Sequence, residues 1–272
     1  MESLINLVTP FDFENNIDYE RLKVLLDHFL NNNVDGIVLF SDVSEVGSLS
    51  TKEREELTNF VIGYIDERLK IYINLSGNVE EILLFNSFIK DKKIDAYIIN
   101  VNVGNDTGII KYISYLSDIL KRNITVDCHK QLNIEVIRTL SYYRNIIGCI
   151  VRSDDLKYLM DVSNLTKDNF CLYLANDYLI LVGISLGFKG IISVIGNCYP
   201  NFVYEVSKNI PLSNEEYFKY DNLIKDIYSD SKVESIKYLL KINNLIKDKT
   251  RLPHDTCSKV LKRKIEEDYL NL

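Results

Sequence analysis

The sequence lacks the features that mark secreted and membrane-spanning proteins. Its longest uncharged apolar run within 272 residues, Tyr178 to Phe188, is too short to cross a bilayer. The first residues, Met1 to Ser3, do not have the basic and then apolar layout of a signal peptide. We therefore expect a soluble, cytoplasmic protein with no membrane partner.

Cysteine, histidine and positive charge are also too sparse for several kinds of site. The five cysteines are odd in number and never occur as CxxC, and the three histidines lie far apart in the sequence. Such cysteines are typical of free thiols in a reducing compartment, so we expect no disulfide framework, no metal and no cofactor. The formal net charge is -7, with Lys and Arg scattered among acidic residues, which argues against nucleic acid as a partner.

Short β-branched segments alternate with longer segments of helical period. Hydrophobic residues make up 46% of the chain, enough for one large core. The alternation predicts parallel strands joined by helices. We expect eight strands, at 4–8, 35–40, 70–75, 95–101, 124–128, 146–151, 170–174 and 190–195.

The segments between these strands carry helix signals. Ser50 followed by Glu53 has the spacing of a capping box, and the residues from Asp18 to Asn31 place leucines on one face. Eight strand-helix units in about 210 residues predict a (β/α)8 TIM barrel over 1–212, with a helical appendage packed on it over 213–272. An open doubly wound sheet is the alternative, but Thr9 to Asp12, after the first strand, contains no phosphate-binding glycine.

Three stretches of the chain resemble one enzyme family. They are Leu7 to Asp12, then Asn145 to Gly148 with Ser153 to Leu156, and finally Asn176 to Asn197. In this order they are similar to the dihydrodipicolinate synthase and N-acetylneuraminate lyase family. The resemblance implies a TIM barrel, a tetramer built from tight dimers, and condensation or cleavage of 2-keto acids. In that family a strand-six lysine forms a Schiff base and a strand-five tyrosine relays protons.

The residues at the family's catalytic positions are different in this chain. The family motif Gly-Ile-Lys-Glu corresponds to Gly148 to Val151, which puts Ile150 at the lysine position. The strand-five tyrosine corresponds to Asp127, and a second tyrosine, after strand four, corresponds to Val103. Isoleucine cannot form an imine, so the resemblance implies that no catalytic residue of the family is retained.

The carboxylate-binding motif of the family, Gly-Thr-Thr-Gly-Glu, is also altered. It corresponds to Ser41 to Glu45, in which only the glutamate is kept. Asp42 would repel the carboxylate of a keto acid bound in the usual pose. The remaining candidates for ligand binding at the carboxyl ends of the strands are Ser41, Asp42, Asp127, His129, Arg152 and Ile192.

These candidates allow three interpretations. In the first, Asp42, Asp127, His129 and Arg152 gather at the mouth of the barrel as an ion-pair network that fills a disused pocket. In the second, Arg152 binds the carboxylate or phosphate of a different ligand. A third interpretation is acid-base catalysis by Asp127 and His129 without a covalent intermediate.

We therefore predict a pseudoenzyme of this family, which acts as a homo-oligomer, as the partner of an active paralogue, or as a binder of a small anion. The alternative is a lyase or aldolase with rewired acid-base residues.

Overall fold

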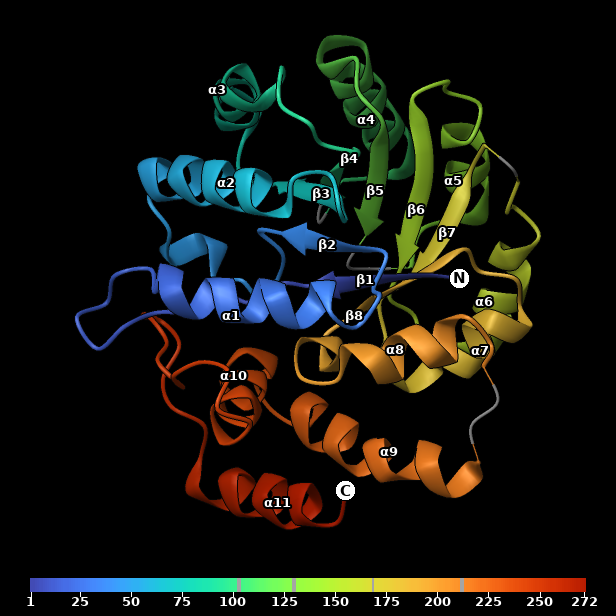
Figure 1. The fold of residues 1–272 in the computed structure, drawn as a ribbon. Coiled ribbons are helices and arrows are strands. Elements are labelled where there is room, and N and C mark those ends of the chain that lie inside the picture. Colours follow the sequence, from blue (N-terminus) through green and yellow to red (C-terminus); the bar gives the residue numbers. More distant parts are fainter. Residues whose placement is uncertain (102–103, 129–130, 168, 211–212) are drawn as a thin grey trace.

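Eight short parallel strands pair in chain order and close into a barrel, which confirms the predicted (β/α)8 fold. The computed structural model describes residues 1–101, 104–128, 131–167, 169–210 and 213–272. Figure 1 shows the strands at the centre and the helices around them. The strands are β1 (Glu2–Asn6), β2 (Gly36–Leu39), β3 (Lys70–Leu75), β4 (Ala96–Val101), β5 (Ile124–Cys128), β6 (Ile146–Val151), β7 (Cys171–Leu174) and β8 (Gly190–Ser193).

The predicted strands overrun the observed ones most at β1 and β8. Leu7 and Val8 leave the sheet but stay buried, and Ile195 begins a 3-10 helix while remaining buried. Their side chains pack against surrounding helices in the outer core. A run of hydrophobic residues indicates that a segment is buried. It does not distinguish a strand from a buried turn that follows the strand.

The helices surround the barrel and continue beyond it. Ser50 and Glu53 form the predicted capping box at the start of α2, and Asp18 caps α1 through the backbone N–H of Arg21. The α-helices are α1 (Tyr19–Leu30), α2 (Thr51–Ile65), α3 (Val79–Ile89), α4 (Asp106–Leu120), α5 (Ile134–Leu140), α6 (Leu156–Ser163), α7 (Ile180–Ser185), α8 (Pro200–Ser207), α9 (Asn214–Tyr228), α10 (Lys232–Ile242) and α11 (Lys259–Leu270), with 3-10 turns η1 (Val46–Ser48), η2 (Asp177–Leu179) and η3 (Ile195–Asn197).

A layer of branched hydrocarbon side chains fills the middle of the barrel. The pairing register places four residues from the even-numbered strands at one level, namely Val38, Ile98, Ile150 and Ile192. They belong to one interior cluster, and each is at most 4% exposed. Ile150, which the resemblance places at the family's lysine position, is thus one of the four side chains of an aliphatic layer.

The next layer toward the carboxyl ends of the strands is polar. Asn6, Asn74 and Asp127 stand two residues beyond Leu4, Tyr72 and Thr125 on the odd-numbered strands, and all three are buried. Arg152 follows Ile150 by two residues and therefore faces the same side of β6. Along β1, β3, β5 and β6 the barrel interior therefore becomes polar within two residues, whereas β7 is followed by the apolar Ala175.

The C-terminal helices α9, α10 and α11 lie together on one side of the barrel, next to α1 and α8 in Figure 1. Lys237 of α10 is fully buried, so this helix is anchored in the core. The division into a barrel over 1–212 and an appendage over 213–272 stays a prediction. Among the described residues, no helix is both long and apolar enough to span a membrane.

Candidate functional site

Arg152 and Asp127 form a two-pronged ion pair where the strands end. The Arg152 Nε donates to Asp127 Oδ1 at 2.9 Å, and Nη2 donates to Asp127 Oδ2 at 2.8 Å. Both residues face inward, because Asp127 pairs with Ile150 across β5 and β6 and Arg152 continues β6 on the same side. This parallel arrangement is the strongest geometry for a guanidinium and a carboxylate.

Asp42 lies beside this pair and receives three donors. Arg152 Nη1 and Lys232 Nζ each lie 3.2 Å from Asp42 Oδ2, and Asn6 Nδ2 donates to Oδ1 at 2.8 Å. Burial by itself would raise the pKa of the Asp42 carboxyl, but attraction to Arg152 and Lys232 outweighs it and holds the pKa well below its usual range. Asp42 is therefore ionised at neutral pH.

These four charged side chains, Asp42, Asp127, Arg152 and Lys232, are called the mouth network below. Two carboxylates balance two cations, so the network as a unit is neutral. Burial opposes the charged form of Arg152, but its contacts with Asp127 and Asp42 raise the pKa of the guanidinium further above its ordinary value. Three of its five N–H donors already bind protein carboxylates, so an incoming anion would compete with them.

The other residues singled out from the sequence lie near the network or outside the described part of the chain. Ser41 is buried beside Asp42, and its Oγ has no hydrogen-bond partner among the described residues. Ile150 and Ile192 lie one layer below. His129 and Val103 fall at positions outside the described residues, so the acid-base interpretation with His129 stays a prediction.

Three residues of this region, Asn6, Lys232 and Tyr228, were not found from the sequence. Asn6 carried a weak signal, as a polar residue two positions after Leu4 and therefore on the same, inward face of β1. Tyr228 and Lys232 come from the C-terminal helices α9 and α10. Lys232 is 190 residues away from Asp42 in the sequence. No local pattern identifies such a long-range partner.

Tyr228 connects the same C-terminal region to the loop after β7. Its hydroxyl donates to Asp177 Oδ2 at 3.1 Å, and the same oxygen accepts from the backbone N–H groups of Val194 and Ile195. Burial raises the pKa of the Asp177 carboxyl, although these donors act in the opposite direction. The Lys232 ammonium lies 5.1 Å from the centre of the Tyr228 ring.

A second ionic cluster forms around Glu45, which lies in the same loop after β2 as Asp42. Glu45 pairs with Lys237, and both side chains are 0% exposed. Lys237 Nζ also donates to the carbonyl of Lys249 at 2.8 Å and lies 4.3 Å from the centre of the Phe11 ring. The Arg251 backbone N–H donates to Glu45 Oε2 at 2.8 Å. Glu45, Lys237 and Arg251 are called the buried clamp below.

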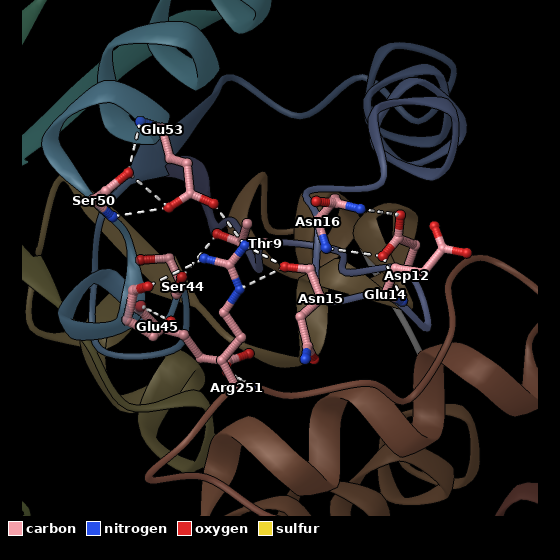
Figure 2. Close-up of polar contacts among 11 residues, drawn as sticks. Thr9, Asp12, Glu14, Asn15, Asn16, Ser44, Glu45, Ser50, Glu53 and Arg251 are labelled. Carbon is pink, nitrogen blue, oxygen red and sulfur yellow. Dashed lines mark hydrogen bonds and ion pairs between the residues drawn. The ribbon is translucent and has the colours of Figure 1, made fainter.

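The Arg251 side chain joins the loop after β1 to the first turn of α2, as Figure 2 shows. It donates to the carbonyl of Asn15 at 2.9 Å and to Glu53 Oε1 at 2.6 Å. The hydrogen bond from Arg251 and those from Ser50 lower the pKa of Glu53 to about 2. Glu45, which the resemblance matches to the glutamate of the family motif, therefore connects the loop after β2 to the C-terminal segment.

Comparison with known proteins identifies the family. The model described as the Dihydrodipicolinate synthetase family matches residues 1–270. The chain belongs to the dihydrodipicolinate synthetase family. Its relatives include the 4-hydroxy-tetrahydrodipicolinate synthase of Karelsulcia muelleri, which is 28% identical across 98% of this chain and 96% of the relative. The synthase of Methanospirillum hungatei is 26% identical across 96% of this chain and 95% of that protein.

Solved structures of dihydrodipicolinate synthetase relatives share the fold. The 4-hydroxy-tetrahydrodipicolinate synthase from Methylacidiphilum fumariolicum SolV has a TM-score of 0.91 and 19% identity, covering 99% of this chain and 94% of that one. A structure described as the first monomeric dihydrodipicolinate synthase variant has a TM-score of 0.89 and 21% identity, covering 100% and 97%. The similarity extends through the C-terminal helices.

Proposed function

We propose that this chain is a member of the dihydrodipicolinate synthetase family that does not carry out Schiff-base chemistry and acts by associating with another copy or with an active relative. The observation that carries the proposal is the place of Ile150. It closes an aliphatic layer together with Val38, Ile98 and Ile192. Among the described residues, no amine stands at this level to attack a carbonyl.

The mouth network supports the same proposal. Arg152 is the cation nearest to the missing lysine in sequence, but a guanidinium stays protonated and does not form an imine. Three of its five N–H donors are also occupied by Asp127 and Asp42. We interpret this network as a structural replacement for the catalytic residues that the resemblance leads one to expect.

Trapping with borohydride after the addition of pyruvate tests the proposal. We expect no reduced adduct in the mass of the intact protein. The Methanospirillum hungatei synthase, treated in the same way, is the positive control. An adduct on any lysine contradicts the proposal, and peptide mapping would locate it. Lys232 is the first position to inspect, because its amine lies beside Asp42.

Association is tested separately. Two exposed apolar side chains on α6 support association, because Leu156 and Met160 lie one turn apart on the same face of this helix. Sedimentation of the purified chain measures homo-oligomers, and purification from its own cells shows whether an active relative accompanies it. A monomer that brings no family member with it contradicts the partner role. Location in the cytoplasm stays part of the proposal.

The rewired enzyme remains the second candidate, and it draws support from the relatives named as synthases. In this case Asp127 and Arg152 would contribute to turnover. Activity on pyruvate or another 2-keto acid that is lost in Asp127→Ala and Arg152→Ala would favour this function. The control is Asp154→Ala, a residue outside the network.

A further inference from the structure

The three donors around Asp42 have the arrangement of a binding site for a carboxylate. They come from separate parts of the fold, Asn6 from β1, Arg152 from the end of β6 and Lys232 from α10. One oxygen of Asp42 accepts from the amide and the other lies between the guanidinium and the ammonium. Each oxygen of a planar carboxylate thus has its own partners.

Most of this arrangement is held in place without Asp42. Asn6 is 2% exposed and fixed in β1. Asp127 orients Arg152 through two hydrogen bonds on the guanidinium edge that includes Nε, which leaves Nη1 directed at Asp42. The Lys232 side chain begins at the first residue of α10, a helix anchored by buried Lys237. Asn6 and the Arg152 guanidinium are therefore preorganised, which favours anion binding, and Lys232 adds a second cation to them.

We propose that Asn6, Arg152 and Lys232 form a site for a small monocarboxylate such as formate or acetate, and that the Asp42 side chain is its built-in occupant. Asp42 then acts as an autoinhibitory contact. Its side chain is 26% exposed, so rotation toward solvent can uncover the donors. Because a tethered group has a high effective concentration, a free carboxylate competes poorly with it in the unaltered protein.

The inference extends the proposed function, because both concern the mouth network, but it is tested independently. Acetate has no ketone and cannot form an imine, so its binding does not depend on the result with pyruvate and borohydride. An adduct with pyruvate would overturn the proposed function and leave the acetate result unchanged.

The experiment compares Asp42→Ala with the unaltered chain by thermal unfolding in sodium acetate and in sodium chloride of equal ionic strength. Alanine removes the occupant and keeps the donors. At an acetate concentration about tenfold above its dissociation constant, we expect the midpoint of Asp42→Ala to rise by about 3 °C over chloride. The unaltered chain is expected to show less than a third of this shift.

Two matched variants define the site. Asp42→Asn fills the same space without charge, so we expect no acetate response beyond that of the unaltered chain. Asp42→Ala combined with Lys232→Met removes one of the two cations, and we expect it to bind acetate at least tenfold more weakly than Asp42→Ala alone. An equal response of Asp42→Ala and the unaltered chain overturns the proposal, as does a response that survives in the double variant.

A folding defect in Asp42→Ala does not remove the test. Asp42→Ser is a milder truncation, and its response to acetate is judged by the same criterion. Refolding of either variant from urea that improves in acetate but not in chloride supports the proposal. Refolding that is the same in both salts contradicts it.

Discussion

The mouth network and the buried clamp are both ionic, and both join the C-terminal segment to the loop after β2, but they differ in contact with water. In the clamp, the side chains of Lys237 and Glu45 are 0% exposed. In the mouth network, the side chain of Asp42 is 26% exposed and that of Lys232 is 31% exposed. Water screens the charges of Asp42 and Lys232 at the mouth and is excluded from the Glu45–Lys237 pair of the clamp.

This difference separates two roles for charge. A fully buried pair contributes little net stability, yet removal of one partner leaves an uncompensated charge in the core. Removing one partner of a partly exposed pair costs less stability, because water solvates the charge that remains, and the groups of such a pair stay accessible to a competing ion. The Glu45–Lys237 pair therefore ties α10 to the loop after β2 out of contact with water, whereas Asp42 and Lys232 at the mouth remain in contact with it.

The largest effect is expected from breaking the clamp on one side only. Glu45→Ala leaves the Lys237 ammonium buried without a counterion, so we expect the free energy of unfolding to fall by about 3–5 kcal/mol. Urea unfolding followed by circular dichroism measures the loss. The control is the double variant Glu45→Leu with Lys237→Met, which should recover at least half of it. A loss of less than about 1 kcal/mol for Glu45→Ala would mean that the clamp is not anchored by this pair.

A smaller effect is expected at the mouth. Asp127→Ala removes the two-pronged partner of Arg152, whose side chain is only 16% exposed. We expect a loss of about 2 kcal/mol, because Asp42 still neutralises part of the guanidinium charge. The same urea experiment on Asp42→Ala should give a smaller loss. A larger loss of stability in Asp42→Ala than in Asp127→Ala would show that Asp42, rather than Asp127, holds Arg152.

The fold was predictable from the sequence because the strand pattern is local. Alternating strand and helix segments, Asp18 at a helix start and the capping box at Ser50 each depend on neighbours in the chain. The approach of Asp127 and Arg152 could also be anticipated, because strand alternation places both inside the barrel. For these features, short-range rules and the barrel topology were sufficient.

The C-terminal side of the site could not be predicted in this way. In the sequence, Lys232 and Lys237 have the pattern of ordinary polar positions on an amphipathic helix. Their partners, Asp42 and Glu45, lie in another part of the chain. A buried lysine on a helix has no local signature. Only the packing of α10 against the barrel reveals that the appendage completes the site.

Acidification is expected to weaken the mouth network and the contact between Arg251 and Glu53. The pKa of Asp42 lies below its unfolded value because Arg152 and Lys232 outweigh the effect of burial, and that of Glu53 is lowered to about 2, first by the hydrogen bond from Arg251. A carboxyl with a lowered folded pKa adds stability above its unfolded value and loses it as the pH falls toward the folded one. The thermal midpoint should therefore drop between about pH 5 and pH 3.

The contribution of the mouth to this drop is isolated by Asp42→Ala. Below about pH 4 the unfolded chain binds a proton at Asp42 that the folded chain does not, so stability depends on pH with a slope of up to about 1.4 kcal/mol per pH unit for this group. The variant lacks the group and should show a shallower slope between pH 4 and pH 3. Parallel curves would mean that Asp42 is protonated equally in the folded and unfolded chains.

The smallest effect, expected for Lys232→Met, is also the sharpest test of the comparison. The ammonium is partly exposed and shares Asp42 with Arg152, so we expect a loss of less than about 1 kcal/mol, seen as a shift of the thermal midpoint of no more than about 4 °C. At about 1 M salt the Debye length falls to about 3 Å, and the difference from the unaltered chain should disappear. The loss in Lys237→Met should persist in the same salt, because that side chain is excluded from water. If both losses respond equally to salt, the two regions share one electrostatic environment and the distinction between them is wrong.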